Sequence, residues 1–175
     1  GVAMGSIVKK PLELFMDQNL FEKLNITNYI LQTDLTERPY FGGGMYLTPR
    51  DMMKFGELYL NNGTWKGKQV ISKEWINRSF KNYRTLENTK DKNGYGYFWW
   101  HKSYVVGEKT IASIEARGAG GQYIFIIPIL KTVVVIMRAF EHTPVVEALP
   151  AFARDICRAA MSVDVPLSDI TGCIP

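Results

Sequence analysis

The sequence predicts an α+β fold, and three observations support this prediction. Helical patterns of apolar residues fill much of residues 12–80. From Tyr95 onward, apolar and aromatic residues occur in shorter runs, and two of these runs are joined as in an antiparallel hairpin. A final helical pattern follows Thr143. Helices, then antiparallel strands, then a closing helix is the order expected of an α+β domain.

Three helices are predicted before the strands. Residues 12–24 place apolar side chains at helical spacing opposite a polar face. The second helix begins at Thr48-Pro49-Arg50-Asp51, because threonine is a good N-cap, proline fits the first helical position and an acid at the third can bond back to the cap. It ends near Asn61-Asn62-Gly63. Ser72 caps the third helix, which runs to about Phe80.

The predicted strands cover residues 95–100, 110–116, 122–127 and 132–138. The last two are β-branched or aromatic runs joined by Pro128-Ile129-Leu130-Lys131, which predicts a hairpin. Their near-continuous apolarity indicates burial on both faces, so helices should cover this sheet.

Two connections and a closing helix complete the prediction. Residues 34–47 are loop-like and contain three consecutive glycines, which suit a sharp bend. Residues 64–71 form a short hairpin around Gly67. Thr143-Pro144 opens the last helix. Its inward-facing side chains are Leu149, Phe152, Ile156 and Ala160.

Composition limits the classes of function. The 175 residues are enough for one domain, and we expect residues 1–175 to form a single one. The net charge is +4, but the basic residues are scattered, which argues against nucleic-acid binding. No apolar run is long enough for a membrane span. Cys157 and Cys173 leave the redox compartment open, and neither has the spacing of a metal ligand.

Three features of the sequence could carry chemistry. Ser6-Ile7-Val8-Lys9 matches the S-x-x-K pattern of acyl-serine enzymes, but Pro11 marks a helix end nearby, and a chance match is favoured. His101 and His142 lack a nucleophile or carboxylate at motif spacing, so surface or packing roles are favoured. The glycine-rich stretch Ala116–Gln122 is either a tight turn or the wall of a cleft.

The order of several segments resembles the C-terminal half of the serine β-lactamase and penicillin-binding-protein superfamily, in the branch with class C β-lactamases, esterases and D-aminopeptidases. The resemblance spans most of residues 11–140. The segments are "KPLELFMDQNLFEKLNITNY", "GGGMYLTPRDMMKFGELYLNNGTWKGKQVISKEWI", "GYGYFWW" and "ARGAGGQYIFIIPILKTVVVIM".

The resemblance implies an antiparallel sheet covered by helices, a mostly helical region, and an active site between them that needs no cofactor or metal. The family's third motif, K-T-G or H-G-G, lies on a sheet strand, and Ala119, Gly120 and Gly121 take its position here. The backbone N–H of Gln122 would be one oxyanion-hole donor. Ala119 replaces the usual cation, which favours esterase- or amidase-like chemistry. Arg117 could supply that cation from the same strand face.

The resemblance also implies that the family's S-x-x-K and Y-x-N motifs would precede Gly1, since Ser6 and Lys9 fall too late in the family order. We therefore expect a C-terminal fragment of a β-lactamase-like domain that acts on an ester or amide only within the intact protein. The alternatives are a catalytically inactive binding or remnant domain of the same fold and an unrelated α+β domain. We also expect the chain to self-associate through the face left by the missing half. The resemblance suggests a periplasmic or secreted location, although the sequence shows no targeting segment.

Overall fold

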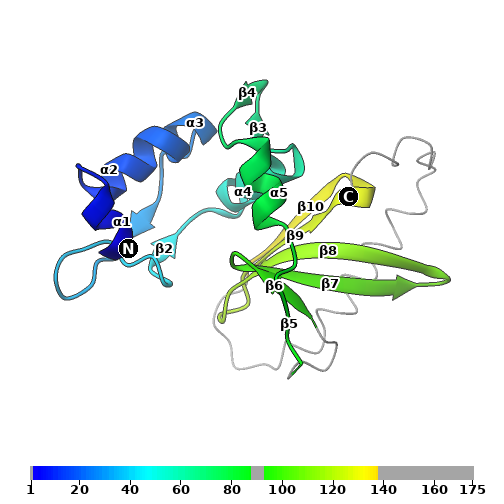
Figure 1. The fold of residues 1–175 in the computed structure, drawn as a ribbon. Helices are drawn as coiled ribbons and strands as arrows, with labels where there is room; N and C mark the ends of the chain where they lie inside the picture. Colours follow the sequence, from blue (N-terminus) through cyan, green and yellow to red (C-terminus); the bar gives the residue numbers. More distant parts are fainter. Residues whose placement is uncertain (1, 88–92, 138–175) are drawn as a thin grey trace.

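In the computed structural model of this chain, residues 2–87 and 93–137 are described (Figure 1). The predicted closing helix after Thr143 lies outside these residues, as do His142, Cys157 and Cys173. No helix within the two described ranges has the length and apolarity required to cross a bilayer.

The N-terminal part is helical, as predicted. After α1 (Val2–Ile7), one continuous helical segment is formed by α2 (Leu12–Met16), a π-helical turn η1 (Asp17–Phe21) and α3 (Glu22–Leu24). It ends at Asn25, whose φ of 52° is left-handed and stops the helix. The predicted helix over residues 12–24 is therefore confirmed.

Helix α4 (Pro49–Leu60) lies between two hydrophobic cores. On one side, Leu58 is fully buried against Phe21 and Leu24. On the other side, α4 packs on the sheet, and Phe55 contributes to both cores. Figure 1 shows α4 and α5 between the N-terminal helices and the strands. Because α4 joins the two cores, its packing fixes the position of the helical part relative to the sheet.

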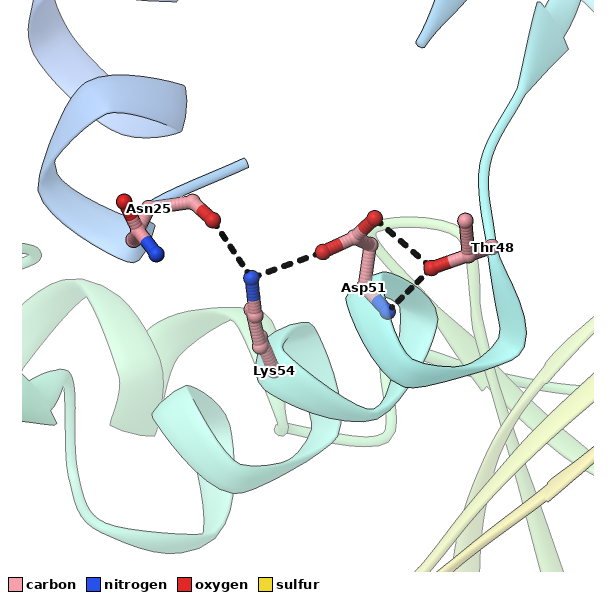
Figure 2. A network of polar contacts seen from close by, with 4 residues as sticks. All are labelled: Asn25, Thr48, Asp51 and Lys54. Atoms are coloured by element: carbon pink, nitrogen blue, oxygen red, sulfur yellow. Dashed lines mark hydrogen bonds and ion pairs between the residues drawn. The ribbon is translucent and has the colours of Figure 1, made fainter. Parts of the chain in front are cut away.

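The start of α4 is held by a small polar network (Figure 2). The Thr48 hydroxyl accepts a hydrogen bond from the Asp51 N–H at 3.1 Å and donates one to the Asp51 carboxylate at 2.7 Å. The Lys54 ammonium contacts the same carboxylate at 2.7 Å and donates to the backbone carbonyl of Asn25 at 2.6 Å. The predicted N-cap is confirmed, and Lys54 additionally ties the start of α4 to the end of α3.

Removing either part of this network should weaken the fold. Thr48→Ala loses the N-cap bond and should lower the free energy of unfolding by about 1 kcal/mol. Lys54→Met keeps the aliphatic stem and should cost about 1 kcal/mol, since its charge-assisted bonds are partly solvated. Urea denaturation measures both values. Lys68→Met, at an exposed lysine of β4, is the control and should cost nothing measurable.

Acid should weaken the same network. Burial raises the pKa of Asp51, but the bonds from Lys54 and Thr48 and the charge of Lys54 outweigh burial, so the pKa falls below its ordinary value of 3.8. The stabilisation is therefore complete above pH 3.8 and is lost as the pH falls through the lower pKa of the folded state. Asp51→Asn should consequently be less stable at pH 7 and lose less stability on acidification below pH 3.8.

Shorter elements connect the helices. The ribbon of β3 (Thr64–Trp65) and β4 (Lys68–Gln69) confirms the hairpin predicted around Gly67. Helix α5 (Lys73–Ser79) begins as predicted, with the Ser72 hydroxyl accepting from the N–H of Trp75 at 3.2 Å. A second ribbon was not predicted. It is formed by β1 (Ile30–Leu31) and β2 (Met45–Tyr46), which border the glycine-rich loop.

The main sheet is an antiparallel meander in the order β10-β9-β8-β7-β6-β5. The predicted strands over residues 110–116 and 122–127 and the hairpin that follows are confirmed, and the strand predicted over 132–138 is confirmed for Thr132–Ile136, while residue 138 lies outside the described residues. One face packs on α4 through Trp99, Ile124 and Ile126, so the predicted helical cover is confirmed for this face. The strands are β5 (Arg84–Thr85), β6 (Gly94–Gly96), β7 (Trp99–Val106), β8 (Lys109–Arg117), β9 (Tyr123–Ile127) and β10 (Thr132–Ile136).

The single strand predicted over residues 95–100 is wrong. Tyr97 and Phe98 form a two-residue turn that separates β6 from β7, and Gly96 pairs with Trp99 across it. Both turn residues have positive φ, 47° and 70°. Such turns favour asparagine and glycine, so two aromatic residues gave no turn signal in the sequence.

Candidate functional site

The candidate site is the turn between β8 and β9. The Gly118 N–H donates to the Gln122 carbonyl at 2.8 Å, and the Gly121 N–H donates to the Gly118 carbonyl at 3.1 Å. Gly121 has a φ of 85°, a conformation that glycine adopts without a steric penalty. This is a three-residue hairpin loop with a bulge at its last glycine. Figure 1 shows it at the left end of β8, on the side of the sheet towards β2 and the N-terminal helices.

The expected site residues therefore lie in a turn rather than on a strand, which corrects the position expected for Ala119, Gly120 and Gly121. The pairing of β8 with β9 continues to Gly118 and Gln122, so the three residues between them form the loop. The Gln122 N–H donates no hydrogen bond to any group in residues 2–87 or 93–137. The Gln122 side chain bonds the Gly120 carbonyl at 3.1 Å, and Ala119 is exposed. Within the described residues the N–H groups of Ala119 and Gly120 likewise have no acceptor, so the turn offers the Gln122 N–H among three free backbone donors, beside a small apolar side chain.

Arg117 ends β8 directly before the turn, and its guanidinium contacts Glu115 and Trp100. Its Nε lies 2.8 Å from a carboxylate oxygen of Glu115, and the guanidinium lies 4.8 Å from the ring centroid of Trp100. Glu115 is only 1% exposed and also accepts a hydrogen bond from the Tyr104 hydroxyl at 2.8 Å. The Nε of Arg117 is therefore engaged by Glu115, and Arg117 does not stand as an unpaired replacement for the family's cation.

This Glu115 cluster was not predicted. Strand pairing places Glu115 opposite Trp100, so their side chains share the sheet face away from α4. The available signal was the alternation of residues 113 and 115 along the predicted strand 110–116, which, continued by one residue to Arg117, puts Glu115 and Arg117 on one face. A lone glutamate in an apolar strand indicates a buried ion pair.

The other candidate residues have no arrangement suited to catalysis. Helix α1 ends at Ile7, so Lys9 does not lie one helical turn after Ser6 on the same helix. The Ser6 hydroxyl donates to the Ala3 carbonyl instead. His101 is half-buried on β7, and burial lowers the pKa of its imidazole. Residues 2–87 and 93–137 contain no cluster of three or more His, Cys, Asp or Glu residues that could hold a metal ion.

Comparisons with known proteins identify the family. The Beta-lactamase family model matches residues 1–157. The structure resembles a "Putative 6-aminohexanoate-dimer hydrolase from Bacillus anthracis", with a TM-score of 0.72 and 23% identity over 91% of this chain and 41% of that one. It also resembles a "putative beta-lactamase from Bacteroides dorei DSM 17855", with a TM-score of 0.52 and 16% identity over 80% of this chain and 50% of that one.

No curated protein matches the chain. At these identities the two solved structures support the fold alone, and the chain spans less than half of the length of the first. The family match covers most of the sequence and agrees with the antiparallel sheet and its helices. The chain belongs to the Beta-lactamase family, with the fold of a β-lactamase-like hydrolase.

Proposed function

We propose that this chain is the C-terminal portion of a serine hydrolase that cleaves an ester or an amide through an acyl-serine intermediate. The observation that carries the proposal is the Gln122 N–H, which the bulged turn leaves without an acceptor within the described ranges. A backbone donor held in this way can bind the oxyanion that develops during acyl transfer. The serine and its lysine would belong to residues upstream of Gly1.

The proposed catalytic group is the Gln122 N–H, and Ala119, Gly120 and Gly121 would form the wall against which the substrate lies. Ala119 carries no charge, and Arg117, the cation directly before the turn in the described part of the chain, is paired with Glu115 rather than with a substrate carboxylate. This favours esters and amides without a charged group at that position. No step of the proposed reaction requires a metal or a cofactor.

The test uses the protein with its upstream residues. Gly121→Val should reduce kcat by about 100-fold with little change in KM, because the turn can no longer hold Gln122 in its conformation. Gly107→Val is the matched control, since Gly107 has a φ of 61° in the turn at the other end of β8. It should carry the same backbone strain and leave kcat unchanged. Equal losses of kcat in both variants would show an effect on folding rather than on catalysis.

The alternative function is a binding or remnant domain of the same fold without catalysis. It is favoured if the upstream residues lack S-x-x-K and Y-x-N. A fluorophosphonate probe separates the two functions, since it should label a serine in the longer protein and leave the present chain unlabelled. Labelling of Ser6 would contradict our interpretation of Ser6 and Lys9 as a chance match.

We further propose that the chain alone self-associates. Several large apolar side chains in the N-terminal part are exposed, including Ile7 at 79%, Ile30 at 63% and Leu35. Exposed apolar groups of this size are typical of surfaces that contact another protein surface. Light scattering should therefore show a mass above that of a monomer. A monomer at high concentration would contradict this proposal.

A further inference from the structure

The turn of Tyr97 and Phe98 lies beside the candidate site. In the ladder of β7 and β8, Trp100 pairs with Glu115. Phe98 lies two residues before Trp100 and Arg117 lies two residues after Glu115, so both reach the same end of the two strands. The turn that follows Arg117 carries Gln122. The two turns are therefore neighbours on one end of the sheet.

Both residues of the aromatic turn adopt a conformation that is unfavourable for bulky side chains. A left-handed backbone costs such a residue free energy that the rest of the structure must offset. Tyr97 makes contacts that can offset this cost. Its hydroxyl accepts a hydrogen bond from Nε of Arg78 at 3.1 Å, and its ring centroid lies 5.4 Å from that of Trp75 and 5.3 Å from that of Tyr83.

Within the described residues, Phe98 makes no comparable ring contacts that would offset the cost of its left-handed backbone. Its side chain is 85% exposed, and no ring contact of Phe98 is found within residues 2–87 and 93–137. Glycine or asparagine would fit the turn better, and neither would expose a phenyl ring to water. The fold thus gains nothing from Phe98 that would explain its presence, so a role in contact with another molecule is indicated.

We infer that Phe98 binds the apolar acyl chain of the substrate beside the β8–β9 turn. This inference rests on the proposed function. Two observations favour an apolar group. The exposed side chains at this end of the sheet include Ala119 and Phe98, both apolar, and Arg117, the cation directly before the β8–β9 turn, is paired with Glu115. Contact of a phenyl ring with hydrocarbon removes apolar surface of both from water.

The test is hydrolysis of p-nitrophenyl esters of increasing acyl length by the protein with its upstream residues. The wild type should gain in kcat/KM from acetate to octanoate. Phe98→Ala should lose about 10-fold more kcat/KM on octanoate than on acetate. Val105→Ala is the control, because Val105 is 67% exposed near the opposite end of β7. It should keep the wild-type dependence on acyl length.

Phe98→Gly adds a second measurement on the present chain. Relief of the left-handed strain should raise the melting temperature by about 2–4 °C, while the longer protein carrying this variant loses octanoate hydrolysis. An unchanged dependence on acyl length in Phe98→Ala, or a lower melting temperature of Phe98→Gly, overturns the inference and leaves the proposed function standing. Absence of ester and amide hydrolysis by the wild type overturns the proposed function and this inference together.

Discussion

Gly56→Leu should lower the free energy of unfolding by about 3 kcal/mol, one of the two largest effects that we expect in this chain. Gly56 is buried in α4 where the helix crosses the sheet. A Cβ at this position would lie 2.4 Å from a methyl carbon of Val133 and 3.0 Å from one of Ile124. Both are β-branched side chains with few rotamers, so the helix itself would have to move. Because α4 joins the two cores, this movement should loosen both.

A graded series and a matched control separate this effect from helix propensity. Gly56→Ala should cost about 1–2 kcal/mol, since the gain in propensity offsets part of the clash. Gly5 is the control because it also lies inside a helix, and, apart from its chain neighbours and the backbone of its own helix, no atom lies within 4 Å of the position of its Cβ. Gly5→Ala should be neutral or stabilising. Stabilisation by Gly56→Ala in urea denaturation would contradict the packing described for α4.

The sequence predicts those parts of the fold that depend on local chemistry. Thr48, Pro49 and Asp51 specify a helix start through groups within four residues of one another, and the structure has the start at that place. The β9–β10 hairpin is equally local, since two β-branched runs flank a connection that contains a proline. These elements need no information from distant residues.

Features that depend on distant residues were missed. The turn at Tyr97 and Phe98 breaks an aromatic run that has strong strand propensity, and it is supported by Arg78 and Trp75 of α5. The bulge at Gly121 moves the expected site residues from a strand into a turn. At Tyr97 and Phe98, tertiary contacts override the strand propensity of the aromatic residues. At Gly121, one added residue changes the pairing of the two strands. The resemblance predicted which residues form the candidate site, but the conformation of the turn that holds them could be described only from the structure.

The second large effect is expected for Glu115→Ala, which should cost about 3 kcal/mol. The substitution leaves the Arg117 guanidinium without its carboxylate next to Trp100, and it removes the acceptor of the Tyr104 hydroxyl. The Arg117 side chain is 21% exposed, so water can solvate part of its charge, and the cost lies at the low end for a broken buried pair. Urea denaturation measures the change.

Two further variants establish whether the charge pair is the cause. Tyr104→Phe removes one hydrogen bond and should cost about 1 kcal/mol. Replacing Glu115 and Arg117 together with methionine removes both charges, and should recover more than half of the stability that Glu115→Ala loses. A negligible cost for Glu115→Ala would show that Glu115 does not hold Arg117. The guanidinium would then be available at the β8–β9 turn. That result would contradict the proposed preference for uncharged substrates and favour anionic substrates instead.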